Sequence, residues 1–439
     1  MHSLFNSNIC EIDKIISNES RLLERLIVAA REGHLCIIGG EEDCEVEVLK
    51  GEEEWFKKKV GRWGNRYYLQ KNWILENRVV KEFKRLLQTE VDAIDIGNLK
   101  GVNVKQHMAV KKGLCEGVLC LTGGPGTGKS YTIGKIIERF QGSVCVCAPT
   151  GKAAALLQER LNMKVGTLHR ILGVKEGKDL FYGEETLHYD MVIVDECSMI
   201  DVGMWSRLLR GVETGTRLIL VGDQDQLPPV EAGRVFEELC AYMQTRGRGY
   251  VYLDECMRSD RYKILEMAER VKMGELIEYE GLRGGIEKLW KEGYQLLSCL
   301  RKGRYGVEEM NRLCEGGNEQ PIIITRSNYR MGISNGELGM VQGEKVMIGG
   351  RCFRRALIPE YEKSYCLSVH KSQGSEFDKV AFFVPKGSEV FGRAILYTGI
   401  TRAREEIIVF SEEGVIEACM TSPSDKMSGI TVKLQEGVG

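Results

Sequence analysis

The spacing of hydrophobic residues changes near residue 100. Before that point, apolar residues recur three and four positions apart in segments 20–30 and 73–87, as on one face of a helix. The apolar positions are Leu22, Leu23, Leu26, Ile27, Trp73, Leu75, Val79, Val80, Phe83 and Leu86. An acidic cluster at residues 41–54 separates the segments and is interpreted as a solvated loop or edge. The pattern predicts a small helical N-terminal domain over residues 1–100.

After residue 100, short apolar runs alternate with helical patterns. Strands are predicted at 117–122, 143–148, 191–196 and 217–223, and helices at 129–140 and 152–161. Near-continuous apolar runs of this length suit parallel strands that are covered on both faces. Alternation of such strands with helices predicts an α/β domain, here over residues 101–250.

A second set of apolar runs begins near residue 320. Its predicted strands are 322–327, 365–370, 379–384 and 405–410, with a helix-like segment at 393–404. Helical patterns fill residues 260–315, between the two sets. We therefore expect a second α/β lobe over residues 251–439, separated from the first by a cleft.

Composition narrows the class of protein. At 439 residues, the chain is too long for one simple core, and 43% hydrophobic with 28% charged residues is ordinary for a soluble protein. A net charge of -2 argues against a nonspecific polycation but not against local basic strips. No apolar run approaches the roughly 20 residues that span a bilayer. We expect a cytoplasmic protein with no membrane association.

The cysteines do not have the spacing of metal ligands. There are fifteen cysteines and six histidines, but no CxxC pair. Cys145 and Cys147 alternate with valines, which is typical of a strand core. A zinc site is not expected, and a chain rich in buried cysteines suits a reducing compartment.

The segment GGPGTGKS, residues 123–130, follows one predicted strand and precedes a helix. It fits the pattern G-x-x-x-x-G-K-[ST], in which backbone N–H groups and the helix N-terminus hold phosphate. Lys129 would reach the β- and γ-phosphates of ATP, and Ser130 would hold Mg²⁺. A glycine-rich turn that matches by chance is the alternative, and the strand–helix context weakens it. The predicted nucleotide-binding residues here are Gly123, Gly124, Pro125, Gly126, Thr127, Gly128, Lys129, Ser130 and Tyr131.

A second candidate element ends the apolar run 191–194. Asp195 is suited to the Mg²⁺ shell, and Glu196 to polarising a water for attack on the γ-phosphate. Alone, the two acids could simply favour a helix N-terminus. Together with the phosphate loop, they indicate nucleotide hydrolysis. Gln226, in VGDQDQLPPV, could sense the γ-phosphate, although that segment alone is only a strand followed by a turn.

Seven motifs that occur in a fixed order give the sequence a specific resemblance to a known family. GGPGTGKS, APTGKAA, GTLHRILG, VDECSMID, GDQDQLPPV, VHKSQGSEFD and LYTGITRAR occur over about residues 100–410. In this order they resemble the RecD branch of the superfamily 1 DNA helicases, and residues 67–80 resemble the segment before its motor. The resemblance implies two RecA-like P-loop NTPase lobes with ATP between them and single-stranded DNA across their top. It also implies 5′ to 3′ motion and a small SH3-like insertion at about 330–365.

The resemblance assigns further residues by motif position. Gln106 would read adenine, Glu376 would face the sugar, and Arg258 and Arg402 would meet the γ-phosphate. Surface salt bridges are the alternative for the two arginines. The implied DNA contacts are Pro149, Thr150, Lys152, Thr167, His169, Asn335, His370, Lys371 and Ser372. Lone histidines are more often structural, so only membership in these motifs favours His169 and His370.

The resemblance also implies a biological setting. It is that of the alpha subunit of exonuclease V, a RecBCD-type heterotrimer with RecB-like and RecC-like subunits that acts on duplex ends in double-strand break repair and recombination. The N-terminal domain would dock on the partner, and no nuclease constellation is present in the sequence. A stand-alone RecD-like helicase and a protein that uses ATP only as an assembly switch remain alternatives. Short spacings around residues 174–190 and 330–365 leave room only for small insertions.

Overall fold

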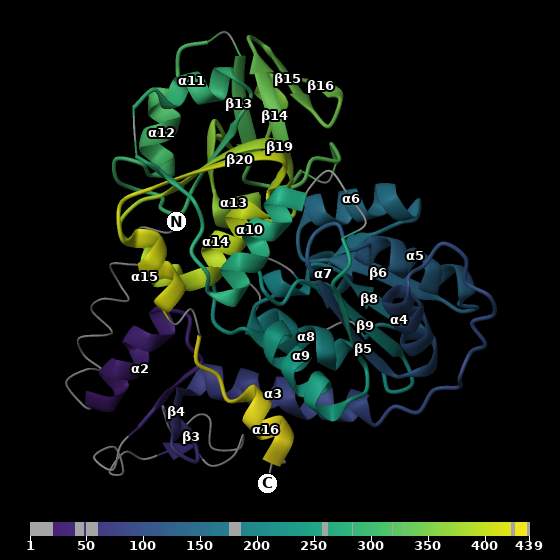
Figure 1. Ribbon diagram of the computed structural model, residues 1–439. Coiled ribbons are helices and arrows are strands. Elements are labelled where there is room, and N and C mark those ends of the chain that lie inside the picture. Colours follow the sequence, from purple (N-terminus) through teal and green to yellow (C-terminus); the bar gives the residue numbers. More distant parts are fainter. Residues whose placement is uncertain are drawn as a thin grey trace.

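The computed structural model describes most of the chain (Figure 1). The described ranges are 21–39, 48–49, 60–174, 186–256, 262–282, 284–317, 319–328, 330–422 and 426–436. The predicted acidic cluster at 41–54 lies outside them except for β2 (Val48–Leu49), and Arg258 lies outside them entirely. Among the helices in these ranges, none combines the length and apolar character needed to cross a membrane.

The first lobe is built on a six-stranded parallel sheet. Its strands, in spatial order, are β10 (Tyr250–Leu253), β5 (Val118–Gly123), β9 (Arg217–Gly222), β8 (Met191–Val194), β6 (Val144–Ala148) and β7 (Gly166–Thr167). Alternate residues face opposite layers: Leu218 and Leu220 join one hydrophobic cluster, and Ile219 joins the other. Both faces are therefore covered, as the continuous apolar runs predict. The strand β10 carries this sheet past the predicted boundary at residue 250.

The helices of the first lobe follow the strands closely. They are α4 (Val104–Cys115), α5 (Lys129–Arg139), α6 (Gly151–Leu161), α7 (Leu168–Ile171), α8 (Val202–Gly211), α9 (Val235–Arg246) and the short 3-10 turn η3 (Cys197–Met199). Because α5 and α6 begin directly after strands β5 and β6, their N-termini lie at the carboxyl edge of the sheet, where α/β proteins bind ligands.

The second lobe has its own parallel sheet of five strands. In spatial order these are β11 (Glu280–Gly281), β20 (Ala403–Ser411), β19 (Phe377–Val384), β12 (Gln295–Ser298) and β18 (Cys366–Ser368). The helical elements are α10 (Tyr262–Met273), α11 (Ile286–Lys291), α12 (Val307–Leu313), α13 (Val369–Ser372), η6 (Ser388–Phe391), α14 (Gly392–Ile400) and α15 (Val415–Thr421). Strand β12, which lies between β19 and β18, was not among the predicted strands, although all four of its residues are buried. Figure 1 shows this lobe, in green and yellow, above the blue and teal first lobe.

A separate antiparallel sheet interrupts the second lobe. Its strands are β16 (Arg351–Arg354), β15 (Lys345–Ile348), β14 (Leu338–Gln342), β13 (Glu319–Ile324) and β17 (Tyr361–Lys363), with the turn η5 (Arg355–Leu357) before β17. The predicted strand at 322–327 was grouped with three strands that join the parallel sheet, but β13 pairs antiparallel with β14 and β17 instead. An insertion was expected at 330–365, and its SH3-like character stays a prediction.

The N-terminal unit is not purely helical as predicted. Besides α2 (Arg21–Arg31) and α3 (Gln70–Leu87), it contains a four-stranded sheet. The strands are β1 (Cys36–Ile38), β4 (Arg66–Leu69), β3 (Val60–Trp63) and β2 (Val48–Leu49). These strands are two to four residues long, too short for a recognisable alternation of apolar and polar residues.

The last described helix, α16 (Ile430–Glu436), returns to the first lobe and the N-terminal unit (Figure 1). Ile430 and Leu434 belong to the same hydrophobic cluster as Phe83 and Phe236. The backbone N–H of Thr431 donates to Glu238 on α9 at 2.8 Å. The segment that follows the second lobe thus packs between α3 and α9.

Candidate functional site

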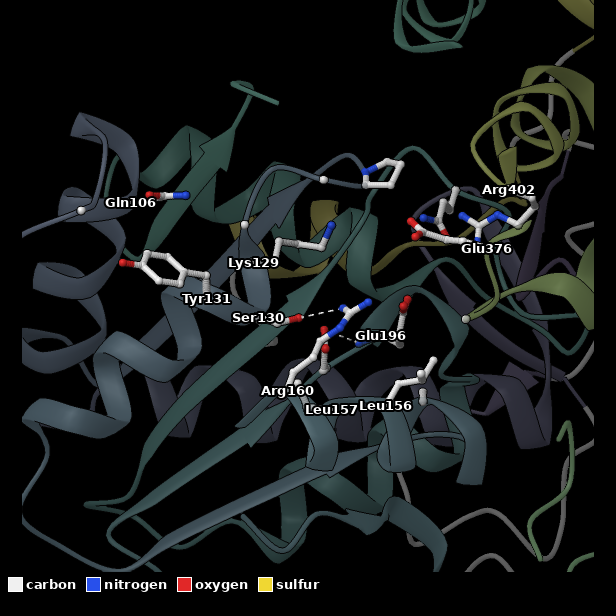
Figure 2. Close-up of a pocket in the computed structure, with 18 residues that line it drawn as sticks. Gln106, Lys129, Ser130, Tyr131, Leu156, Leu157, Arg160, Glu196, Glu376 and Arg402 are labelled. Carbon is white, nitrogen blue, oxygen red and sulfur yellow. Dashed lines mark hydrogen bonds between the residues drawn. The ribbon is translucent and has the colours of Figure 1, made fainter. Parts of the chain in front are cut away.

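A cavity of about 660 Å³ lies between the two lobes (Figure 2). Residues of both lobes form its wall. Predicted residues that line it are Gln106, Pro125, Gly126, Gly128, Lys129, Ser130, Tyr131, Asp195, Glu196, Gln226, Glu376 and Arg402. Its size is within the range of small-molecule sites. The carboxyl edge of the first sheet and the second lobe therefore share one pocket.

The glycine loop between β5 and α5 needs its glycines. Gly126 and Gly128 have φ angles of 80° and 86°, in the left-handed region that side chains avoid. A Cβ atom on Gly123 would lie 2.4 Å from the carbonyl oxygen of Leu253 on β10. Thr127 is buried and ties the loop with a 2.8 Å hydrogen bond to the Gly124 carbonyl. Gly123, Gly124 and Thr127 therefore shape the loop from behind, and the other loop residues face the cavity.

Lys129 lies at the start of α5, inside the curve of this loop. Its Nζ donates to the carbonyl oxygens of Gly123, at 2.6 Å, and Gly124, at 2.9 Å. The ammonium and the N–H groups of the first helical turn face the cavity together, a combination that suits phosphate. This cradle fits the polyphosphate of a nucleotide.

Asp195 and Glu196 follow the buried strand β8. Asp195 Oδ1 accepts the N–H of Glu196 at 2.9 Å, and Glu196 has a φ of 54°, a costly conformation for a side-chain-bearing residue. Burial raises the pKa of Asp195. Burial, with the neighbouring Asp195 charge, raises the pKa of Glu196 to about 7. A pKa close to neutral pH suits a group that accepts and releases a proton.

Ser130 and Asp195 both line the cavity, and their hydroxyl and carboxylate oxygens are hard ligands for a metal ion. Mg²⁺ prefers such ligands and usually takes the rest of its shell from water and substrate phosphates. The donor set therefore fits the predicted Mg²⁺, with Ser130 and Asp195 as the protein residues that would hold it.

Gln226 lies in the loop after β9. Its Nε2 donates to Asp223 Oδ2 at 3.0 Å, and its Oε1 is buried without a hydrogen-bond partner among the described residues. A buried unpaired acceptor is costly and points to a ligand or water that completes it. Gln226 thus has a free acceptor at the wall of the cavity, as a sensor of bound ligand requires.

The loop around Gln226 is fastened to the second lobe. The Tyr397 hydroxyl donates to Asp223 Oδ2 at 2.9 Å. The N–H of Leu227 donates to Thr398 Oγ1 at 2.8 Å, and Gln373 Nε2 donates to the Leu227 carbonyl at 3.0 Å. A change at Gln226 can therefore reach α14 directly.

Arg402 enters the cavity from the second lobe, and its contact with the γ-phosphate stays a prediction. Three hydrogen bonds fix its guanidinium, to the carbonyls of Thr398 and Ser375 and to Thr401 Oγ1. It is 4% exposed, so its charge faces the cavity and not bulk water. Glu376 also lines the cavity and pairs with Arg404 at 3.3 Å.

Gln106 has a structural role that the motif comparison did not indicate. Its Oε1 accepts the N–H of Asn103 at 3.1 Å, and Asn103 Oδ1 accepts the N–H of Gln106 at 2.8 Å, which forms a capping box at the start of α4. Its Nε2 donates to the Thr127 carbonyl at 3.2 Å. One donor and one acceptor position of the amide remain for a base. The adenine role stays a prediction.

Arg160 was missed by sequence reasoning. It lies on α6, and its Nη1 donates to Ser130 Oγ at 3.3 Å (Figure 2). The residues at helical spacing before it line the same wall: Ala153, Leu156 and Leu157. This spacing of three and four positions in a helix that follows the strand edge was the available signal.

Four residues predicted to bind DNA lie at or beside the starts of α6 and α7. Thr150 is the N-cap of α6, and its Oγ1 accepts the N–H of Ala153 at 3.2 Å. Thr167 precedes α7, which exposes His169 to solvent. The Oγ1 of Thr167 is buried and has no partner within the described ranges. Pro149 is half-buried just before α6.

The predicted DNA residues of the second lobe differ in their access to solvent. Asn335 and Lys371 are exposed. His370 is half-buried against Phe391, with ring centroids 5.5 Å apart, and burial lowers its pKa to about 4. Ser372 is fully buried and its hydroxyl donates to the Val369 carbonyl at 2.7 Å. The prediction of a direct DNA contact by Ser372 is therefore corrected to a role inside α13.

Lys152, also predicted to contact DNA, has a partner in the second lobe. Its ammonium donates to Ser375 Oγ of the second lobe instead of pointing freely to solvent. Burial, partly offset by Glu337, lowers the pKa of Lys152 to about 8. A lysine predicted to contact DNA thus also bridges the lobes.

Comparison with known proteins agrees with this arrangement. The AAA domain model matches residues 101–286, and the UvrD-like helicase C-terminal domain model matches residues 363–410. The RecBCD enzyme subunit RecD of Mycolicibacterium smegmatis is 28% identical over 464 residues, covering 85% of this chain and 83% of that protein. The ATP-dependent RecD2 DNA helicase of Deinococcus radiodurans is 30% identical over 356 residues, covering 70% of this chain and 48% of that protein.

A solved structure supports the fold. The crystal structure of Bacteroides Pif1 bound to single-stranded DNA superposes with a TM-score of 0.51, at 17% identity, over 73% of this chain and 94% of that one. At this identity the likeness concerns architecture alone. The ordered motifs, the two domain models and the RecD relatives agree with one another. The chain belongs to the RecD family of superfamily 1 helicases.

Proposed function

We propose that this chain is an ATP-driven 5′ to 3′ DNA helicase and the RecD-type subunit of a RecBCD-like enzyme. One observation carries the proposal: residues of both lobes meet in one cavity, with Lys129, Ser130 and Glu196 on one side and Arg402 on the other. A site divided in this way changes when the lobes move, so chemistry in the cavity is coupled to lobe motion. The relatives whose names include RecD and RecBCD support the same function.

Each residue has a role that follows from its position. When bound, Mg²⁺–ATP supplies the phosphoanhydride bond whose hydrolysis powers the cycle. Lys129 and Arg402 offset negative charge on the phosphates from opposite lobes. Glu196 accepts the proton of the attacking water, and its raised pKa suits that task. Opening DNA costs about 1.4 kcal/mol per base-pair step, which each lobe closure must offset.

The residues predicted to contact DNA are suited to binding its phosphates and not its bases. Thr150 and Thr167 lie at helix starts, where N–H groups face an approaching phosphate, and Lys371 is exposed on α13. His169 and Asn335 add exposed polar groups. Such contacts make binding independent of sequence and weaker at high salt.

The test is ATP turnover with single-stranded DNA, 5′-tailed duplex and 3′-tailed duplex. We expect single-stranded DNA to stimulate turnover, and strand separation only from the 5′-tailed substrate. Turnover that DNA leaves unchanged would reject translocation and favour an ATP-switch protein. Separation from the 3′ tail alone would reject the polarity.

The similarity to RecD2 favours a second candidate, a helicase that acts without RecB-like and RecC-like subunits. Affinity purification from cells separates the two. Recovery of RecB-like and RecC-like chains in equal amounts supports the heterotrimer. Recovery of the chain alone, with full unwinding activity, supports the stand-alone helicase.

A further inference from the structure

Ser375 lies in the turn between α13 and β19, where it connects two parts of the cleft. Its side chain is 4% exposed, and its Oγ accepts a hydrogen bond from Lys152 Nζ on α6. Its carbonyl oxygen accepts a hydrogen bond from Arg402 Nη1 at 3.2 Å. One residue thus contacts the lysine of a DNA motif through its side chain and the arginine of the ATP cavity through its backbone.

The turn that carries Ser375 is itself fixed. The N–H of Ser375 donates to the Ser372 carbonyl at 2.9 Å, and Gly374 and Glu376 on either side line the cavity. Displacement of the Ser375 side chain therefore moves the carbonyl that orients Arg402. A fixed turn transmits such a displacement better than a loose one, because packed groups shift between discrete arrangements.

Lys152 lies where three elements meet. A Cβ atom on Gly151 would lie 2.3 Å from Ser334 Cβ, and one on Gly336 would lie 3.8 Å from Lys152 Cβ. The turn before β14, which exposes Asn335, therefore packs directly on the start of α6. Glu337 and Arg402 are the charged groups that act on Lys152. An ammonium has three N–H donors, so Lys152 can hold Ser375 and a DNA phosphate at the same time.

We infer that Ser375 is a positioning residue that couples DNA at the α6 edge to Arg402 in the ATP cavity, through its hydrogen bond with Lys152. The inference rests on the proposed function, because it assigns the residue that links DNA binding to ATP hydrolysis. A DNA phosphate that attracts the Lys152 ammonium shifts the turn that contains Ser375. The shifted turn then reorients the Arg402 guanidinium. The link joins the lobes, so it responds to their closure.

Ser375→Ala tests the link, because it removes the hydroxyl and keeps the carbonyl that binds Arg402. We expect the ratio of DNA-stimulated to basal ATP turnover to fall at least about fivefold, the lower range of typical allosteric coupling. Coupling is reciprocal, so the change in DNA affinity that nucleotide causes must shrink by a similar factor, measured by fluorescence anisotropy with labelled oligonucleotide. Ser375→Thr keeps the hydroxyl and should retain the coupling.

The matched control is Ser411→Ala. Ser411 is also buried in the second lobe, and its hydroxyl donates to the Val384 carbonyl at 2.9 Å, away from the cavity. A full stimulation ratio in Ser375→Ala, or an equal fall in Ser411→Ala, overturns the inference. In a Lys152→Met background, Ser375→Ala should cause no further loss, and additive losses also overturn it. A wild-type chain that DNA does not stimulate would reject the proposed function itself.

Discussion

Lys129 donates to two carbonyl oxygens of its own loop, contacts that a phosphate-binding ammonium can exchange for ligand. We predict that Lys129→Ala lowers ATP turnover at least about 100-fold, because the charge beside the phosphates is lost, while the fold persists. Steady-state kinetics and circular dichroism measure the two effects. Lys135→Ala is the control, since Lys135 lies on the same helix and pairs with Glu138 at 2.8 Å. Normal turnover in Lys129→Ala would reject the assignment.

His370 illustrates how burial decides a residue's chemistry. Its lowered pKa, about 4, means that it stays neutral near pH 7. We predict that DNA affinity shows no step from His370 between about pH 7.5 and about pH 5.5, so wild type and His370→Phe have parallel salt and pH profiles. A step in wild type that the variant lacks would show that His370 titrates in this range.

The same pKa has a consequence for stability with a definite sign. Below about pH 6.5 the unfolded chain protonates this histidine, whereas the folded chain does not until about pH 4. As the pH is lowered from about 6.5 to about 4, the free energy of unfolding should therefore decrease, by at most about 1.4 kcal/mol per pH unit from this group. Urea unfolding at several pH values should show a shallower fall in His370→Phe.

Sequence motifs identified residues best where the backbone itself makes the site. The loop glycines, Lys129, Asp195 and Glu196 lie together because a strand ends and a helix begins there, which the local pattern determines. Burial of Ser372 and the contact of Lys152 with Ser375 depend on how two distant segments pack. No local pattern contains that information, so those two roles could not be predicted.

At the scale of elements, one residue of α4, Gln106, has two functions. Gln106 closes the capping box that starts this helix and also lines the cavity. We predict that Gln106→Ala lowers stability by about 1 kcal/mol through loss of the cap. Gln106→Glu preserves the capping acceptor but loses the N–H₂ that donates to the Thr127 carbonyl, so stability should also fall while preference for ATP over GTP falls. KM values for both nucleotides measure this, and an unchanged KM ratio would remove Gln106 from base recognition.

Four of the six strands in the first lobe's parallel sheet were predicted, and three of the five in the second lobe's parallel sheet. Continuous apolar runs such as 117–122 and 217–223 correspond to β5 and β9, since both faces of those strands are buried. The run at 322–324 is equally apolar yet belongs to the antiparallel sheet, and β12 has only four residues. Length and apolarity indicate a buried strand but do not determine its partner, because pairing is a long-range property.

At the scale of the whole molecule, a buried ion pair connects α16 to the N-terminal unit. Lys433 Nζ and Glu76 Oε1 are 2.8 Å apart, and both side chains have 0% exposure. The ammonium also lies 4.3 Å from the centre of the Tyr68 ring, and Glu76 accepts the N–H of Gly429 at 3.0 Å. These contacts hold the segment after the second lobe against α3.

We predict that Lys433→Met destabilises the protein by about 3–5 kcal/mol, because it leaves the Glu76 charge buried without its partner. Adding Glu76→Gln should recover part of the loss. Differential scanning calorimetry measures both. The control is Lys288→Met, which breaks an exposed pair with Glu292 and should change stability by less than about 1 kcal/mol. Equal effects of the two lysine substitutions would contradict a structural role for the buried pair.

The return of α16 also sets an order of events during synthesis. Ile430 and Leu434 complete a cluster that contains Phe83 and Phe236, yet the ribosome makes them only after the whole second lobe. Domains usually fold as they emerge, N-terminal parts first. Here the nascent first lobe must wait with part of its apolar surface uncovered until residues 430–434 leave the exit tunnel. Chaperones that shield such surfaces should therefore associate with the growing chain through most of its translation.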